Sequence, residues 1–232
     1  MNLAILQARM TSSRLPGKVM ASVLGEPMIG RQIERLRRSA RIDRLIVATS
    51  HEPSDDPLAA YCQGLGLDVV RGALDDVLGR FAAALADHPD ADVVVRLTAD
   101  CPLADPALID AVIARHHATG ADYTSNTLGT RTYPHGLDAE VVRAEVLMQA
   151  ARLSEDPHER EHVTPYIYRR PEVFRLAGVT RRPSLAQLRW TVDVADDLAF
   201  VRGVYASLYP GDPAFTSEAV VALDPNSSTW QA

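Results

Sequence analysis

Short apolar runs separated by helical patterns are the feature that most constrains the fold of this chain. The runs cover residues 3–6, 45–48 and 93–95, and each leads into a polar loop. Runs of this length are typical of strands that are buried on both faces of a parallel sheet. Between the runs, apolar side chains recur at helical spacing, as at Ile29 and Ile33. The alternation predicts an α/β fold with a three-layer, Rossmann-like open sheet that is mostly parallel.

The domain organisation follows from length and pattern. The chain has 232 residues, of which 47% are hydrophobic, so it can bury one substantial core, and we expect a single domain over 1–224. The apolar pattern loosens in the middle of the chain, which predicts an insertion or lid region over 126–180. A last strand is expected at 188–192 and a helix at 196–209. The polar segment 225–232 is expected to be a loose tail.

Composition argues against several classes of protein. The 30 acidic and 24 basic residues give a net charge of −6, which argues against a surface built to hold nucleic acid. No apolar run approaches the ~20 residues of a membrane span, and the first residues lack the basic start of a signal peptide. Cys62 and Cys101 are the only cysteines, so no disulfide framework is expected. We therefore expect a cytoplasmic protein with no nucleic-acid and no membrane partner.

The loop after the first predicted strand, residues 8–18, combines three cations with three hydroxyl groups. Arg9 and Arg14 can each grip two phosphate oxygens, and Lys18, the only lysine of the chain, offers a compact positive charge. The spacing is not that of a P-loop, and the alternative is a solvated basic connector. Because ligands of open α/β sheets gather at the carboxyl ends of strands, the position of the loop favours binding of a polyphosphate.

Two aspartates follow other predicted strands and are expected at the same edge of the sheet. Asp100 comes after the run at 93–95, and Asp193 ends the expected strand at 188–192. Two carboxylates from separate strands suit Mg²⁺, which completes its shell with phosphate oxygens and water. The alternative for Asp100 is that it only closes a turn before a helix capped by Asp105.

Neighbouring residues receive mainly structural interpretations. Cys101 has no activating histidine near it in the sequence, so we interpret it as a small buried filler and not as a nucleophile. Asp196 is expected to cap the last long helix, and Asp75 or Asp76 to cap an earlier one. The pair at 71–72 would let the backbone approach a nucleotide base.

Residues 158–162 read His-Glu-Arg-Glu-His, which satisfies the zinc-protease pattern. Asp156 followed by Pro157 predicts the start of a helix, in which Glu159 would serve as a capping-box partner. Pro165 interrupts that helix within about two turns, and no third zinc ligand follows. We therefore interpret the segment as structural.

Several segments are informative when they are considered together, in their order along the chain. They are Gln7 to Lys18, Arg71-Gly72 with Asp75 to Leu78, Thr98 to Leu103, Tyr133-Pro134 with Gly136 to Asp138, Glu161 to Pro165, and Arg189 to Asp193. In this order and spacing the set resembles the spore coat polysaccharide biosynthesis protein F family. That family is cytidylyltransferase-like and is related to the acylneuraminate and 3-deoxy-manno-octulosonate cytidylyltransferases. The resemblance covers nearly the whole chain.

The resemblance implies a nucleotide-diphospho-sugar transferase-like fold, often dimeric, with CTP as the donor substrate. It implies that Arg9, Lys18 and Asp100 are catalytic, and that Mg²⁺ is held by Asp100 and Asp193. The implied nucleotide-binding residues are Ala8, Arg9, Met10, Ser12, Ser13, Arg14, Lys18, Arg71, Gly72, Asp76, Thr98 and Asp100. The implied acceptor-binding residues are Tyr133, Gly136, Asp138, Glu140, Glu161 and His162.

Together these features predict a Mg²⁺-dependent cytidylyltransferase that transfers CMP from CTP to an acceptor and releases pyrophosphate. The acceptor would be a sugar acid, a phosphosugar or a small phosphorylated or acidic metabolite, in surface polysaccharide or glycoconjugate biosynthesis. Two alternatives stay open: a glycosyltransferase that consumes a finished nucleotide sugar, and a CTP-binding protein without turnover. The resemblance also predicts a homodimer, with acceptor and dimer contacts in the region 126–180.

Overall fold

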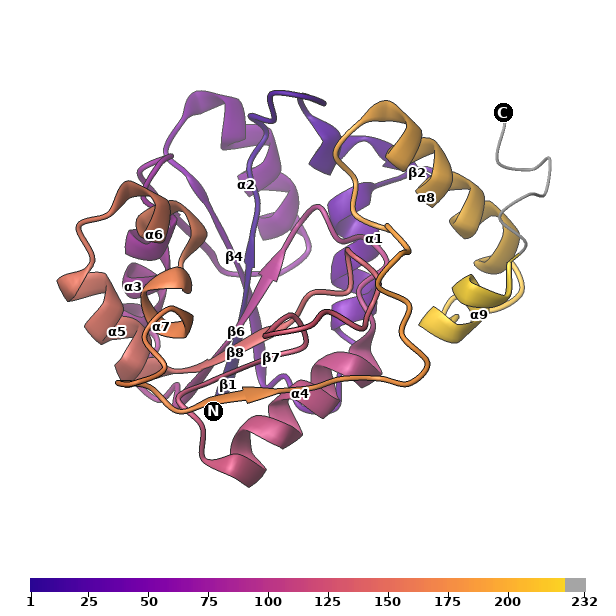
Figure 1. Ribbon diagram of the computed structural model, residues 1–232. Helices are drawn as coiled ribbons and strands as arrows, with labels where there is room; N and C mark the ends of the chain where they lie inside the picture. Colours follow the sequence, from indigo (N-terminus) through magenta and orange to yellow (C-terminus); the bar gives the residue numbers. More distant parts are fainter. Residues whose placement is uncertain (224–232) are drawn as a thin grey trace.

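A seven-stranded sheet forms the centre of the computed structural model, which describes residues 1–223 (Figure 1). In order across the sheet, the strands are β5 (Val69–Gly72), β4 (Arg44–Ser50), β1 (Asn2–Gln7), β6 (Val93–Thr98), β8 (Glu140–Arg143), β7 (Tyr123–Ser125) and β9 (Leu176–Gly178). Strands β5, β4, β1 and β6 run parallel, as do β7 and β9, whereas β8 is antiparallel to β6 and β7. The prediction of a mostly parallel sheet is confirmed.

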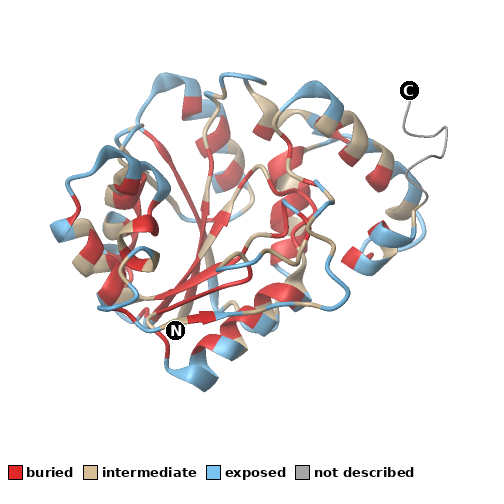
Figure 2. Ribbon diagram, viewed as in Figure 1, coloured by how far each residue is buried: buried red, intermediate tan, exposed pale blue. Residues whose placement is uncertain are grey.

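Helices cover both faces of this sheet (Figure 1). One face carries α3 (Val77–Asp87), α5 (Ala144–Leu153), α6 (Pro157–His162) and α7 (Pro165–Tyr168). The other carries α1 (Met28–Leu36), α2 (Asp56–Gly64), α4 (Pro106–Thr119), α8 (Ala195–Leu208) and α9 (Ser217–Ala222). Strand β1 contributes side chains to the apolar clusters on both faces of the sheet: Leu3 and Ile5 belong to one cluster, and Ala4 and Leu6 belong to the other. Figure 2 shows these strands buried between outer helices with exposed outward sides, which confirms the three-layer prediction.

Predicted capping residues fix where helices begin. Asp105 accepts a hydrogen bond from the backbone N–H of Ala107 at 2.9 Å, and Asp76 accepts one from Gly79 at 2.9 Å. Asp156 starts α6 in the same way. The remaining short elements are η1 (Lys18–Met20), η2 (Pro53–Asp55) and the hairpin of β2 (Ser22–Val23) and β3 (Glu26–Pro27).

Two predictions near the end of the chain are wrong. Residues 188–192 are not a strand: they make a single bridge, between Arg189 and His135. Trp190 and Val192 are buried, which explains the strand-like apolar pattern, but the segment packs across the sheet edge without a ladder of its own. The helix predicted at 196–209 is present as α8, yet its N-cap is Val194, and the predicted capping residue, Asp196, lies exposed in the first turn.

The predicted insertion region, 126–180, supplies β8 and β9 to the main sheet as well as α5, α6 and α7. The predicted tail, 225–232, lies outside the described residues. Within the described part of the chain, no helix combines the length and the apolar character that crossing a membrane requires.

Candidate active site

The loop 8–18 leaves the carboxyl end of β1 and is held in place at both ends. The backbone N–H of Ala8 donates to the carbonyl of Ala48 at 3.0 Å, and that of Met10 donates to the buried carboxylate of Asp55 at 2.7 Å. Gly17 closes the loop with a φ of +74°, a conformation that suits glycine, and donates to the carbonyl of Met10. The cations of the loop are therefore carried by an ordered turn.

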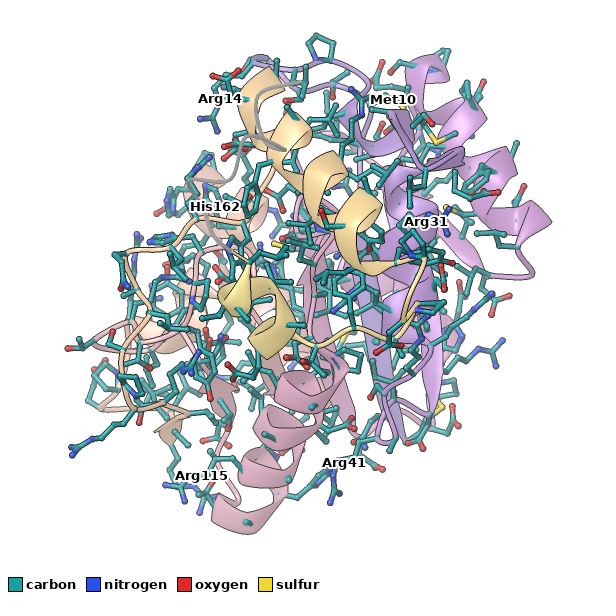
Figure 3. All side chains as sticks on the ribbon, turned by 90° about the vertical axis from the view of Figure 1, so that its right-hand side faces the viewer. Met10, Arg14, Arg31, Arg41, Arg115 and His162 are labelled. Carbon is teal, nitrogen blue, oxygen red and sulfur yellow. The ribbon has the colours of Figure 1, made fainter. Side chains whose placement is uncertain are left out.

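A cavity of about 370 Å³ opens between this loop, the end of β6, the helix α6 and the segment before α8. Its lining includes most of the predicted nucleotide-binding residues: Ala8, Arg9, Ser12, Ser13, Arg14, Lys18, Thr98 and Asp100. Asp193, Glu161 and His162 line it as well. Figure 3 shows Arg14 and His162 at the same end of the molecule, far from Arg41 and Arg115. We refer to this cavity of about 370 Å³ as the nucleotide cavity.

Asp193 gathers three cations, of which Arg14 and Lys18 line this cavity. Lys18 Nζ lies 3.2 Å and Arg14 Nη2 2.9 Å from Asp193 Oδ1, while Arg189 Nη2 lies 2.6 Å from Oδ2. Lys18 also donates to the carbonyl of Val192 at 2.5 Å. Burial raises the pKa of Asp193, but the hydrogen bonds and charges of Arg189, Lys18 and Arg14 outweigh it and leave the pKa below its ordinary value. An anionic ligand would find these cations already assembled.

Asp100 lies directly beside the Asp193 segment, because its carbonyl accepts a hydrogen bond from the N–H of Val192 at 2.8 Å. Among the described residues, the only hydrogen bond to its carboxylate is a weak one from the thiol of Cys101, at 3.5 Å. The described residues hold no cluster of three or more potential metal ligands, so an ion here would depend on these two carboxylates, phosphate and water. Burial raises the pKa of the Cys101 thiol well above its ordinary value, in keeping with a structural filler.

Two further arginines, Arg80 and Arg96, line the nucleotide cavity and were not predicted from the sequence. Arg96 directly follows the apolar run of β6, so the strand-end rule that selected Asp100 also points to it. The Nε of Arg96 donates a hydrogen bond to Gln7 Oε1 at 3.0 Å, and its guanidinium forms an ion pair with Glu140. Arg80 projects from the middle of α3, where no sequence signal separates it from other helical arginines. Its side chain donates to two loop carbonyls while its Nε has no partner within the described structure.

Four predicted nucleotide-binding residues are not among those that line the cavity: Met10, Arg71, Gly72 and Asp76. Arg71 ties β5 to the turn after β4 by donating to the carbonyls of Ser50 and Glu52. A Cβ at Gly72 would lie 2.7 Å from Cγ of Arg80, so this glycine makes room for the arginine. Asp76 caps α3 and pairs with Arg160 of α6 at 2.7 Å.

A second cavity, of about 450 Å³, adjoins the first and shares two residues with it, Arg96 and His162. Of the predicted acceptor-binding residues, Glu140 and His162 line it, and Glu161 lines the nucleotide cavity, 3.6 Å from Arg9. We refer to this space as the second cavity.

The other predicted acceptor residues, Tyr133, Gly136 and Asp138, line neither cavity. Asp138 holds Arg131, a residue of the second cavity, with a hydrogen bond of 2.9 Å to Nη2. Gly136 packs against the backbone of Trp190. The carboxylate of Glu140 is fully engaged by Arg96, by the Tyr123 hydroxyl at 2.9 Å and by the Thr164 hydroxyl.

Residues 158–162, which match the zinc-protease pattern, lie in α6, where Glu159 makes structural contacts. Glu159 is buried, accepts a hydrogen bond from Ser154 Oγ at 2.6 Å and pairs with Arg170 at 2.9 Å. The predicted capping-box role of Glu159 is therefore wrong, because its carboxylate turns toward the interior. His158 and His162 lie on one face of α6 with ring centroids 4.4 Å apart.

Comparison with known proteins identifies a family that matches most of the chain. The cytidylyltransferase family model matches residues 3–198. The chain is 34% identical to the spore coat polysaccharide biosynthesis protein SpsF of Bacillus subtilis, over 97% of this chain and 94% of that protein. A 3-deoxy-manno-octulosonate cytidylyltransferase of Syntrophotalea carbinolica is 39% identical over 48% of this chain and 43% of its own.

Solved structures give the same result. A cytidylyltransferase from Leptospira borgpetersenii superposes with a TM-score of 0.89 at 26% identity, covering 95% of this chain and 92% of its own. A CMP:2-keto-3-deoxy-manno-octonic acid synthetase, solved with CTP, shares the fold with a TM-score of 0.67 at 20% identity, covering 89% of this chain and 98% of its own. The chain belongs to the cytidylyltransferase family.

Proposed function

We propose that this protein transfers CMP from CTP to an acceptor oxygen and releases pyrophosphate. One observation carries the proposal: a single cavity joins the basic loop 8–18 to the carboxylates of Asp100 and Asp193. A triphosphate requires several cations along its length, and nucleotidyl transfer requires carboxylates that can hold a divalent metal ion. Membership of the cytidylyltransferase family supports CTP as the donor.

The protein's own part in the reaction is to hold the leaving group. Arg9, Arg14 and Lys18 bind the β- and γ-phosphates while the acceptor oxygen attacks the α-phosphorus and the bond to the β-phosphate breaks. Arg14 and Lys18 already form ion pairs with the carboxylate of Asp193. They therefore need little rearrangement when the triphosphate replaces this carboxylate as their partner. Preordered cations of this kind stabilise the charge that develops on the departing pyrophosphate.

Asp100 and Asp193 are the residues that would hold Mg²⁺. Oxygen donors suit this ion, and the Asp100 carboxylate carries only a weak thiol contact. Oδ1 of Asp193 becomes available when the triphosphate replaces it as the partner of Arg14 and Lys18. When bound, the ion supplies positive charge that offsets the charge of the phosphates.

For the acceptor we propose a sugar acid, a phosphosugar or a related small acidic metabolite used in surface polysaccharide synthesis. The names of the relatives support this range: one takes part in spore coat polysaccharide biosynthesis, and another acts on 3-deoxy-manno-octulosonate. The second cavity supports it too, since Arg96 and Arg131 lie in its wall.

Two single substitutions test the proposal. Lys18→Ala and Asp100→Ala should each lower kcat for CTP-dependent pyrophosphate release by a hundredfold or more, because each removes a preordered charge worth about 2.7–4 kcal/mol of barrier. Turnover is measured by a coupled pyrophosphate assay across sugar acids and phosphosugars, and circular dichroism checks that the variants are folded.

Matched controls are available for both changes. Arg115→Ala removes an exposed cation at the far end of the molecule, and Asp196→Ala removes an exposed carboxylate next to the site; both should keep turnover within about twofold. Near-normal pyrophosphate release by either Lys18→Ala or Asp100→Ala would overturn the assignment. Consumption of a finished nucleotide sugar would indicate a glycosyltransferase instead, and CTP binding without turnover a binding protein.

A further inference from the structure

His162 occupies the junction between the nucleotide cavity and the second cavity. It lines both, and so does Arg96, whereas its neighbour His158 lines only the second. His162 is the last residue of α6 and is labelled in Figure 3. A side chain in this place can reach a ligand in each cavity at once.

The backbone next to His162 is held in an unfavourable conformation. Val163 has φ +71° and ψ −55°, and the N–H of Thr164 donates to the carbonyl of His162 at 2.8 Å, which together define a tight three-residue turn. This γ-turn is rare and strained, and a positive φ is especially unusual for a β-branched residue. Val163 is fully buried. Strain of this kind persists where the surrounding structure imposes it, often at functional sites.

Neither ring nitrogen of His162 has a hydrogen-bond partner within the described protein, although the ring packs against that of His158 at 4.4 Å. The charged groups that act on the imidazole are His158 and Glu161 of the same helix, Arg96 of β6 and Arg169 after α7. Burial, His158, Arg96 and Arg169 lower the pKa of His162 and Glu161 raises it, with a net lowering below 6.5. At neutral pH the imidazole is therefore uncharged, with a nitrogen free to accept a proton.

We propose that His162 is the general base of the reaction and that the acceptor binds in the second cavity. The inference rests on the proposed cytidylyl transfer. His162 takes the proton of an acceptor hydroxyl as that oxygen forms its bond to the α-phosphorus of CTP. The bond to the β-phosphate breaks at the same centre and pyrophosphate leaves with the electron pair. The imidazolium then returns its proton to water.

This role narrows the class of acceptor. A carboxylic acid, with a pKa of about 4, and a phosphate monoester, with a second pKa of about 6, are mostly deprotonated at neutral pH and need no base. A hydroxyl group keeps its proton and benefits from a base within reach. The attacking atom is therefore a hydroxyl oxygen, and the product is a phosphodiester of CMP. A pyrophosphate-linked product, formed by a phosphate nucleophile, would contradict the inference and is distinguished by ³¹P NMR.

The test compares His162→Gln with wild type, using CTP, Mg²⁺ and the acceptor that gives pyrophosphate release in the screen. In wild type, kcat/KM should rise with pH through a midpoint below 6.5, because only the neutral imidazole accepts a proton. His162→Gln should lower kcat by about 10²- to 10⁴-fold and abolish that acid limb. The Kd for CTP, measured by calorimetry, should change far less than kcat.

His158→Gln is the matched control, because it removes the other imidazole from the same helix face. It should retain the acid limb, with the midpoint moved upward because His158 is one of the groups that lower the pKa of His162. Retention of the limb and of kcat in His162→Gln would overturn the base assignment while leaving the transferase intact. If wild type binds CTP but releases no pyrophosphate with any acceptor, the proposed function fails and the base assignment with it.

Discussion

Asp55 holds the start of the loop 8–18 in place. Its fully buried carboxylate accepts hydrogen bonds from the N–H of Met10 at 2.7 Å, from Thr49 Oγ1 at 2.9 Å, and from both the N–H and the hydroxyl of Ser50. Burial raises the pKa of Asp55, but the hydrogen bonds from Ser50, Met10 and Thr49 outweigh it, so the pKa is lowered overall.

Asp55→Ala should lower the free energy of unfolding by about 3 kcal/mol at pH 7, because several buried donors lose their acceptor. A lowered carboxyl pKa contributes stability in full above the unfolded-state value of about 3.9, and that contribution disappears as pH falls through the folded-state value. The difference in unfolding free energy between wild type and Asp55→Ala should thus become smaller below pH ~4. Urea unfolding at several pH values measures it.

The control for this change is Glu145→Ala, which removes a carboxylate that is 70% exposed and should cost no more than about 0.5 kcal/mol. A gap between Asp55→Ala and wild type that stayed constant down to pH 3 would show that the charge of Asp55 is not what stabilises the loop.

Individual residues could be predicted where a rule about position applied. Lys18 and Asp100 follow the strands β1 and β6, so the rule that ligands gather at strand ends predicts both of them, and the structure brings them into one cavity. Asp193 lines the same cavity, but the strand from which it was predicted is not formed. Asp55 and Arg80 carry no such signal in sequence. Their importance depends on which backbone groups fold around them.

At the scale of elements, the segment 188–193 connects the site to the rest of the fold. It carries Asp193, and through Val192 it anchors both Lys18 and the Asp100 turn. Gly136 lies against it with φ +100°, and a Cβ there would come within 2.5 Å of the Thr191 nitrogen.

Gly136→Ala should therefore displace this segment. We expect a loss of about 3 kcal/mol in unfolding free energy and at least a tenfold fall in kcat, since backbone atoms cannot yield as a flexible side chain can. The control is Gly25→Ala, at φ +82° with no atom within 4 Å of the added Cβ. It should cost only the strain of the left-handed conformation, about 1–2 kcal/mol, with normal kcat. Equal effects of the two substitutions on kcat would contradict the role given to the segment.

The elements that sequence predicted well are those set by local pattern. The caps at Asp76 and Asp105 and the strand cores of β1, β4 and β6 all follow from nearby residues. The segment 188–192 has a strand-like apolar pattern because Trp190 and Val192 are buried. Burial alone does not supply a pairing partner, and the partner depends on the whole sheet.

For the whole molecule, the alternating pattern predicted the three layers and the parallel half of the sheet. It did not predict that 126–180 would extend the sheet with β8 and β9, because β8 returns antiparallel after a long irregular connection. That extension places Glu140 beside Arg96 and α6 beside the nucleotide loop, so both cavities depend on it. Strand pairing between distant parts of the chain cannot be predicted from the local periodicity of apolar residues.

The most direct measurement of the central claim follows CTP, the acceptor, pyrophosphate and cytidylated product together in one reaction with the purified wild-type protein. We predict equal amounts of pyrophosphate and CMP conjugate, formed only with Mg²⁺ present and abolished by EDTA. Full activity in EDTA would contradict the role given to Asp100 and Asp193 as metal ligands. Bound CTP that yields neither product with any acceptor would contradict the transferase itself.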